Sequence, residues 1–251
     1  MVGLRVIENY LNKIILGDGV KTLIDIPCES VDLIVVDPPY FGAKEEFHSR
    51  LMECLDDYLY WYEEWVCEAK RVLKRTGSMY VFIPPLEFAE IHLLIRRHFC
   101  QKQIISWVKP NVMIRQPTMR NYCPKVEFVG FYAKDSKDYT WNSLVKKLGL
   151  QRACNFDVRA TIYSYMNEGV SHPTQKPLSL CAKFIYASSN EGEIVLDPFV
   201  GSGTTCVAAK ALGRKFIGIE IKPKYYKLAN SRIGNVTCED IFEDKPANAL
   251  F

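Results

Sequence analysis

The stretch DLIVVDPPYFG, residues 32–42, constrains the fold more than any other part of the chain. A continuous apolar run rich in β-branched residues is typical of a strand buried on both faces of a parallel sheet. It ends at Asp37 and two prolines, neither of which can donate a backbone hydrogen bond. Because a turn needs one proline at most, we interpret residues 37–40 as a strand end that presents chemical groups to a ligand.

Strands and helices alternate along the rest of the chain. Gly77 is placed to stop a helix at 56–73, and the aromatic run YLYWYEEW inside that helix has the spacing of core residues. The alternation predicts an α/β fold with a doubly wound, mostly parallel sheet and helices on both faces. Apolar runs predict strands at 31–37, 78–84, 103–109, 126–134, 193–197 and 215–221, and helical periodicity predicts helices at 56–73, 86–99, 177–190, 203–213 and 224–233.

A second strand end lies in EIVLDPFVGSGTT, which joins a strand, a Gly-Ser-Gly turn and a helix. Gly201 and Gly203 allow positive φ and close approach of a ligand, and the helix N-terminus offers free N–H groups to a carboxylate. No Gly-Lys-Ser/Thr follows, which excludes a P-loop, and Cys206 occupies the third glycine position of GxGxxG. Asp197 is placed to bind a cation, and Glu220 to bind ribose hydroxyls. S-adenosylmethionine, with its ribose, carboxylate and cation, fits this set.

The two strand ends are predicted to meet. In a doubly wound sheet the strand order reverses near the middle, and the carboxyl ends of the strands there flank one crevice. If EIVLD and DLIVVD are those neighbours, Asp37 and Asp197 lie together although they are far apart in the sequence. The ligand is then held at one strand end and the chemistry occurs at the other.

Three motifs resemble the signature of the DNA amino-methyltransferases: DPPY at 37–40, HPTQKP at 172–177 and DPFVGSGTT at 197–205. Members of that family transfer a methyl group from S-adenosylmethionine to an exocyclic amine of adenine or cytosine. The order, with DPPY before the glycine turn, resembles the permuted β group, which implies a Rossmann-like methyltransferase fold in permuted order. GDGVKTLIDIPCESVDLIVVDPPY resembles the family's N-terminal block, and ISWVKPN with VEFVGFYAK resembles the hairpin near the target base.

The resemblance implies a division of roles among the motif residues. Asp37 and the Pro38 carbonyl accept hydrogen bonds from the target amine, Pro39 helps to stiffen that backbone, and Tyr40 stacks on a base flipped out of the duplex. Phe41 follows where Asn is common in the family, so its role beside the base stays open. The expected cofactor-binding residues are Asp18, Thr174, Gln175, Lys176, Asp197, Phe199, Gly201, Ser202, Gly203, Thr204 and Glu220.

Charge is unevenly distributed along the chain. Residues 1–70 hold 6 Lys/Arg against 14 Asp/Glu, whereas residues 99–165 hold 11 against 4. This asymmetry indicates a polyanion partner for the middle of the chain, with a solvated basic surface as the alternative. We therefore assign 1–109 and 171–251 to the catalytic core, and 110–170 to a small inserted recognition segment that binds double-stranded DNA. The expected DNA-binding residues are Lys109, Arg115, Arg120, Lys125, Lys146, Lys147, Arg152 and Arg159.

The sequence thus predicts a site-specific DNA methyltransferase that acts on adenine N6, because DPPY favours adenine within the family. Cytosine N4 is the alternative. RNA and protein-glutamine methyltransferases are more distant alternatives that usually place the glycine turn first. A nicotinamide-dependent oxidoreductase is disfavoured by the incomplete GxGxxG.

Composition bounds the setting of the protein. No apolar run reaches the roughly 18 residues of a membrane span, and the nine cysteines form no CxxC pair, so neither a membrane nor a metal is expected. Their odd number favours reduced thiols, and we expect buried, inert cysteines in a cytoplasmic protein of prokaryotic or viral origin. The sequence leaves open a homodimer and a cognate restriction endonuclease as partners.

Overall fold

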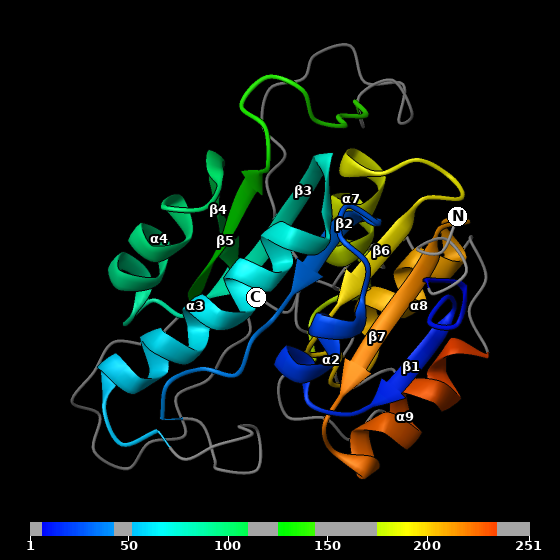
Figure 1. Cartoon of the computed structure of the whole chain (residues 1–251), viewed down its shortest axis with the longest axis horizontal. Helices are drawn as coiled ribbons and strands as arrows, with labels where there is room; N and C mark the ends of the chain where they lie inside the picture. The colour runs from blue at the N-terminus through cyan, green and yellow to red at the C-terminus, as the bar shows by residue number, and fades with distance from the viewer. Residues whose placement is uncertain (1–6, 43–51, 110–124, 144–174, 235–251) are drawn as a thin grey trace, which may run out of the picture.

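The computed structural model describes residues 7–42, 52–109, 125–143 and 175–234 (Figure 1). Within them seven strands form one sheet in the order β1-β7-β6-β2-β3-β5-β4. Neighbours from β1 to β3 are parallel, and β5 runs antiparallel to both β3 and β4, which confirms the mostly parallel sheet. The strands are β1 (Lys13–Leu16), β2 (Val31–Val36), β3 (Leu73–Ile83), β4 (Cys100–Val108), β5 (Val126–Ala133), β6 (Ile194–Asp197) and β7 (Lys215–Glu220).

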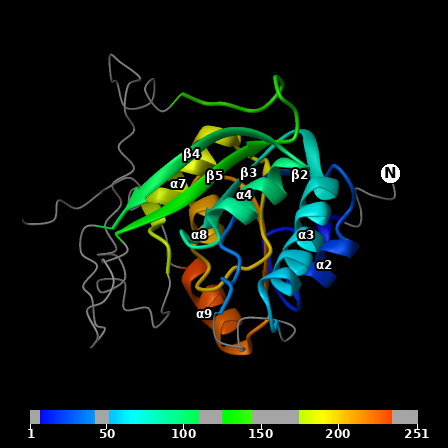
Figure 2. The same ribbon diagram turned by 90° about the vertical axis from the view of Figure 1, so that its left-hand side faces the viewer.

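Helices cover both faces of the sheet, as the doubly wound prediction requires (Figures 1 and 2). Side chains alternate along β2: Ile34 and Val36 enter one core, while Leu33 and Val35 enter the other. Burial on both faces explains why this strand is continuously apolar. One face carries α2 (Gly19–Asp25), α3 (Leu55–Val72) and α4 (Phe88–Arg96), and the other carries α7 (Leu178–Ser188), α8 (Thr204–Ala211) and α9 (Pro223–Ile233).

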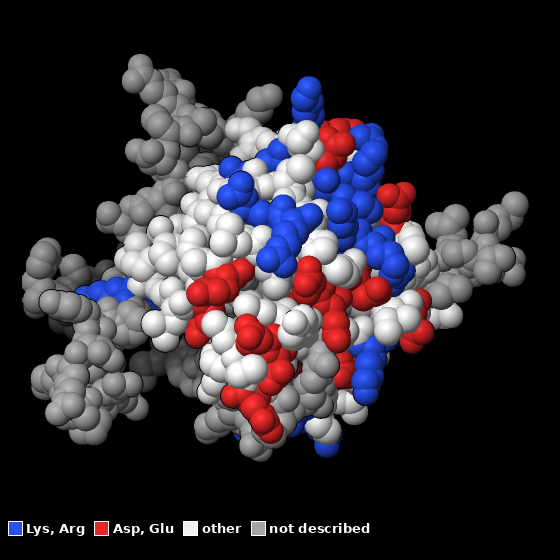
Figure 3. All heavy atoms as spheres, turned by 60° about the vertical axis from the view of Figure 1, so that its left-hand side comes forward, with Lys and Arg blue, Asp and Glu red and all other residues white. Residues whose placement is uncertain are grey.

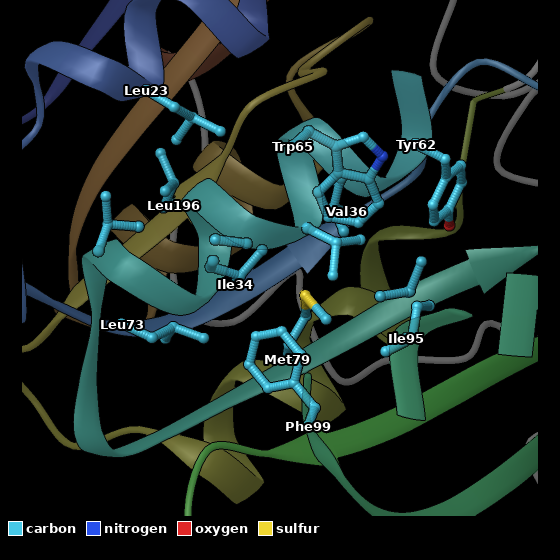
Figure 4. Packing of buried hydrophobic residues seen from close by; sticks show 14 of the residues in the cluster. Leu23, Ile34, Val36, Tyr62, Trp65, Leu73, Met79, Ile95, Phe99 and Leu196 are labelled. Atoms are coloured by element: carbon cyan, nitrogen blue, oxygen red, sulfur yellow. The ribbon is translucent and has the colours of Figure 1, made fainter. Parts of the chain in front are cut away.

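Large aromatic side chains of α3 fill the first core (Figure 4). The rings of Tyr62 and Trp65 meet edge to face with centroids 4.8 Å apart, and Trp65 belongs to the same buried cluster as Val36 of β2. Tyr58 and Trp61 are buried in the same cluster. The prediction that this aromatic run is core is therefore confirmed, apart from residues on the outer side of the helix.

β2 and β6 lie side by side in parallel at the centre of the sheet. The buried Asp32 stabilises this pairing, because one carboxylate oxygen accepts the Ile194 N–H at 2.9 Å across 162 residues of sequence. Its other oxygen accepts a hydrogen bond from Lys74 Nζ at 2.7 Å. The expectation that the strands ending at Asp37 and Asp197 are adjacent in the sheet is confirmed.

Several details differ from the sequence-based expectations. β1 and α2 lie before the first element that periodicity predicts. β5 lies inside the sheet, although the boundary drawn from the sequence places residues 126–133 in the recognition segment. The expectation of buried cysteines holds for Cys181 and Cys206 but is wrong for three exposed thiols. These are Cys28, Cys54 and Cys67.

The prediction that Gly77 stops the helix is also wrong. α3 ends at Val72, and the chain passes directly into β3, which contains Gly77. A Cβ at Gly77 would lie 2.7 Å from Leu73 Cδ2 and 3.1 Å from the Asp32 carbonyl oxygen. The glycine is needed for close packing within the sheet. Among the described residues, no helix is both long and apolar enough to cross a membrane.

We expect Gly77→Ala to lower the free energy of unfolding by about 1–3 kcal/mol, because the added methyl group overpacks a filled site. Gly234→Ala is the matched control, since the nearest atom to its Cβ would be 3.8 Å away. Urea unfolding of both variants measures the difference. Equal stability of the two variants would contradict the packing argument.

Candidate functional site

Four carboxylates line one edge of the sheet. Asp197 and Glu220 are the last residues of β6 and β7, Asp37 follows β2, and Asp18 lies two residues beyond β1. These four strands are parallel neighbours, so their carboxyl ends share one edge. In a doubly wound sheet that edge at the switch point is where ligands bind.

Asp18 shapes the first part of this edge. Its carboxylate caps α2 by accepting the N–H groups of Val20 at 2.9 Å and Lys21 at 3.3 Å. Gly19 lies against the segment that follows β6, where a Cβ would be 2.4 Å from the Pro198 carbonyl oxygen. The Gly-Asp-Gly segment therefore sits directly against the Asp-Pro-Phe segment that follows β6.

The glycine turn is held in a left-handed backbone conformation. Gly201 has φ 52° and Gly203 has φ 89°. Glu220 is fastened to the turn, because its Oε2 accepts the Gly201 N–H at 2.8 Å. A Cβ at Gly203 would lie 2.9 Å from Ala229 Cβ. The close packing of α9 against the turn therefore also requires a glycine at position 203.

Ser202 and Thr204 face α9 and not the strand edge. Arg232 Nη1 donates to the Ser202 carbonyl at 2.7 Å, to its Oγ at 3.1 Å and to Thr204 Oγ1 at 3.2 Å. Both residues are buried. Their hydroxyl groups therefore stabilise the turn from the side of α9.

Asp197 is a buried acid with an unusual protonation equilibrium. Burial raises the pKa of Asp197 to about 7, although the Thr205 hydroxyl and the Phe199 N–H, at 3.0 Å, favour the ionised form. Among the described residues no lysine or arginine pairs with it. The Phe199 ring packs against Trp61, with 5.6 Å between centroids.

Asp37 belongs to a charged cluster that joins four segments of the chain. Lys176 Nζ lies 2.6 Å from Asp37 Oδ2 and 3.8 Å from Glu127 Oε2. Lys109 forms a second ion pair with Glu127, and Tyr40 Oη donates to Glu127 Oε2 at 3.3 Å. The cluster places an aromatic ring, two carboxylates and two ammonium groups at the end of β2.

The prolines after Asp37 are held from the α3 side. Tyr58 Oη donates to the Pro39 carbonyl at 3.2 Å, and Pro38 is buried. Phe41, whose role the sequence leaves open, packs its ring 5.6 Å from that of Tyr58. In this structure Phe41 anchors the turn to α3.

Sequence reasoning missed Glu127, Tyr58, Phe82 and Trp107. Glu127 is the residue for which a signal existed, because it is a charge on the β5 face that otherwise carries buried Val129 and Phe131. The others are aromatic residues in apolar runs, and nothing in their local sequence separates them from the core. Of the predicted cofactor set, Gln175 is buried beside Lys176, and Thr174 lies outside the described residues.

The predicted DNA-binding residues lie mostly outside the described residues. Lys125 is exposed, whereas the Lys109 side chain is only 12% exposed and pairs with Glu127. The predicted residues outside the described ranges are Arg115, Arg120, Lys146, Lys147, Arg152 and Arg159.

On one face of the described surface, Lys and Arg side chains gather above a group of Asp and Glu side chains (Figure 3), and α3 has the same separation of charge along its length. Acidic Asp56 and Asp57 open the helix, and basic Lys70 and Arg71 close it, as the helix dipole favours. α3 runs from the carboxyl end of β2 to the amino end of β3, so its basic end lies away from the site edge. This described basic surface therefore does not border the four carboxylates.

Comparison with known proteins agrees with this geometry. A family model described as DNA methylase, covering N6 and N4 methyltransferases, matches residues 31–231. The chain is 38% identical to DNA adenine methyltransferase YhdJ of Escherichia coli K12, over 90% of this chain and 83% of that protein.

Solved structures share the fold. The M1.HpyAVI–SAM complex superposes with a TM-score of 0.69 at 29% identity, covering 89% of this chain and 99% of that one. The cytosine-N4-specific PvuII DNA methyltransferase has a TM-score of 0.71 at 19% identity, covering 91% and 89% of the two chains. The second likeness concerns the fold alone.

We expect Asp18→Ala to lower the free energy of unfolding by about 1 kcal/mol, because α2 loses its N-cap. Asp18→Asn should keep most of that stability, since asparagine caps helices as well as aspartate does. Thermal unfolding separates the two variants. A similar loss in both would assign the stabilisation to the charge of Asp18 and not to its cap.

Proposed function

Since the chain belongs to the DNA methylase family of N6 and N4 methyltransferases, we propose that it methylates adenine N6 in duplex DNA with S-adenosylmethionine as the donor. One observation carries the proposal. Asp37, with its Pro-Pro-Tyr turn, and Asp197, with its glycine turn, end neighbouring parallel strands. A methyl acceptor and a methyl donor bound at these ends would be adjacent.

The residues at the β1, β6 and β7 ends fit this cofactor. Asp197 is a buried acid without a cationic partner among the described residues, as a site for a cation requires. Glu220 ends the strand after the glycine turn, where ribose hydroxyls bind in such folds. Gly201, Gly203 and Asp18 complete the proposed contacts, and S-adenosylmethionine would supply an electrophilic methyl group on sulfur.

The chain's own groups would activate the target amine. That amine is a poor nucleophile because its lone pair is shared with the ring. Asp37 and the Pro38 carbonyl would accept its N–H groups and free the lone pair, which is electrostatic preorganisation worth roughly 2.7–4 kcal/mol per group. Tyr40 would stack on the flipped base, and such stacking recovers about 1–3 kcal/mol of the cost of flipping.

Adenine is favoured over cytosine. The motif is DPPY, and the 38% identical YhdJ is named a DNA adenine methyltransferase. The cytosine-N4-specific PvuII enzyme, at 19% identity, shares the fold but supports no statement about the base. Cytosine N4 is the second candidate because the family includes both activities.

We further propose that DNA recognition lies in residues 110–170 outside β5, with the basic residues of that segment contacting phosphates. Lys125 is the member of this set that the structure describes as exposed. The protein is proposed to act in the cytoplasm. A homodimer and a cognate restriction endonuclease are compatible with this function, and neither is required by it.

The deciding experiment is incubation of unmethylated genomic DNA with isotopically labelled S-adenosylmethionine, followed by mass spectrometry of the nucleosides. Labelled N6-methyladenine is expected. Labelled N4-methylcytosine would move the assignment to the second candidate. Absence of label from every nucleoside, with cofactor binding intact, would overturn the proposed activity.

We expect Asp37→Ala to lower the single-turnover methylation rate by on the order of 10²–10³-fold, because an acceptor of the amine is lost. Cofactor affinity should stay close to that of the wild-type protein, since the proposed cofactor contacts belong to other strands, whereas the melting temperature should fall because the buried Lys176 loses its ion-pair partner. Rate, affinity and melting temperature are measured on the same preparation. A near-normal rate in a folded variant that binds the cofactor would end the catalytic role of Asp37.

Cofactor binding should release protons from Asp197. With the pKa of Asp197 at about 7, the ligand-free protein holds a fraction of a proton there at neutral pH. A cationic ligand lowers that pKa, so affinity should rise between pH 6 and pH 8 with release of up to about half a proton at pH 7.

Calorimetry in two buffers of different ionisation enthalpy measures this release. Some protons are also released from the amine of the ligand itself. Asp197→Asn should abolish only the additional proton release that comes from Asp197. Asp25→Asn, at an exposed position on α2, is the matched control and should release as many protons as wild type. Equal proton release from all three proteins would refute the role of Asp197.

A further inference from the structure

The ion pair between Lys176 and Asp37 links segments 139 residues apart and is largely buried, with the Asp37 side chain 23% exposed. Lys176 precedes α7, and its side chain is 9% exposed. Its ammonium lies 5.0 Å from the centre of the Phe82 ring, 5.5 Å from that of Tyr40 and 5.9 Å from that of Trp107. An ammonium enclosed by three rings and a carboxylate is fixed in place.

The two oxygens of Asp37 differ. Oδ2 accepts the hydrogen bond from Lys176 at 2.6 Å. Oδ1 is buried and has no hydrogen-bond partner among the described residues. A buried acceptor without a partner is unfavourable and rare in folded proteins, so this atom requires an explanation. An N–H group of the substrate that donates to Oδ1 would provide the missing hydrogen bond.

Glu127 holds the other members of the cluster. Its carboxylate receives the Tyr40 hydroxyl at 3.3 Å and lies 3.8 Å from Lys176 Nζ, while Lys109 pairs with it from the end of β4. Two carboxylates and two ammonium groups thus balance one another in a buried site. Removal of one buried charge leaves another uncompensated, which is strongly unfavourable.

We propose that Lys176 and Glu127 are positioning residues for Asp37. Lys176 binds Oδ2 and keeps Asp37 an ionised acceptor whose Oδ1 is directed to the target amine. Glu127 fixes both Lys176 and the stacking residue Tyr40. This inference rests on the proposed function for the identity of the amine, and on the ion-pair geometry for the rest. It moves Lys176 from the cofactor site to the acceptor site.

Electrostatics supports this assignment. Burial raises the pKa of Asp37, and Lys176 opposes that rise by charge and by hydrogen bonding. Burial works against the charge on Lys176, but Asp37 and Glu127 hold its pKa above the ordinary value. Without Lys176 the pKa of Asp37 would be higher, so the carboxyl group would be protonated over a wider pH range. A protonated carboxyl group could then present its O–H, a donor, to the amine. The charged and titratable groups around Asp37 are Lys176, Glu127, Lys109, Tyr40, Tyr58, Tyr62, Cys181 and Asp197.

The first measurement needs no methylation. Carbon-13 NMR of aspartate carboxyls in the ligand-free protein gives the pKa of Asp37, with Asp37→Asn assigning the resonance. Lys176→Met should raise this pKa by about 1–3 units, because an opposite charge at this distance is lost. Glu127→Gln should lower it, since a like charge is lost. Lys176→Arg should keep it near the wild-type value.

The second measurement is the pH profile of single-turnover methylation at saturating cofactor. The rate falls as pH falls through the pKa of Asp37, so Lys176→Met should move this acid limb upward by the same amount. The rate should partly recover at high pH, where Asp37 ionises. Lys227→Met, on the exposed side of α9, is the matched control and should leave the profile unchanged.

The outcomes separate the proposals. An unmoved carboxyl pKa in Lys176→Met and in Glu127→Gln would overturn the positioning role. An unmoved Asp37 pKa in Lys176→Met, together with a tenfold or greater loss of cofactor affinity, would also overturn this role. Lys176 would then be assigned to the methionine carboxylate of the cofactor. If the protein methylated no DNA, the carboxyl titration would still decide the Lys176 assignment while the proposed function failed on its own evidence.

Discussion

The parallel pairing of β2 with β6 is the constraint on which the rest of the structure depends. It joins strands 162 residues apart through the Asp32 carboxylate and the Ile194 N–H. A shift of one residue would exchange the two faces of β2 and carry Ile34 and Leu33 into the wrong cores. The same shift would move the residues at the end of β2 to the opposite face of the sheet. The register that buries β2 therefore also sets the direction in which Asp37 points.

Strands buried on both faces could be read from the sequence because their burial leaves a continuous apolar run. That is why β2 and β6 were predictable as strands, whereas their adjacency was expected only from the strand-order reversal of a doubly wound sheet. β1 has four residues and includes the exposed Lys13, and its place depends on pairing with β7, which local sequence does not reveal. At Gly77 a local stop signal was misleading, because the glycine serves a close contact between β3 and the Asp32 backbone.

The site was predictable to the level of strand ends. Acids that follow parallel strands must share an edge, so the grouping of Asp37, Asp197 and Glu220 follows from topology, whereas Asp18 was assigned only through the family resemblance because β1 was not predicted. Contacts made by side chains from separate segments were not predictable. The sequence-based assignment of Lys176 followed a motif, whereas its ammonium lies on a carboxylate 139 residues away.

Asp37 and Asp197 are neighbours with different counter-ions. Burial raises the pKa of both, although the Asp37 side chain is 23% exposed and Asp197 only 4%. Asp37 has a lysine 2.6 Å away, and that charge opposes the rise of its pKa. Asp197 has hydrogen-bond donors but no cation among the described residues, and its pKa rises to about 7. A carboxylate that must accept a hydrogen bond from a neutral amine needs an internal counter-ion, because the substrate brings none. A carboxylate that binds a cationic ligand can do without one, because the ligand supplies the charge. The difference in counter-ions therefore supports acceptor chemistry at the end of β2 and cofactor binding at the end of β6.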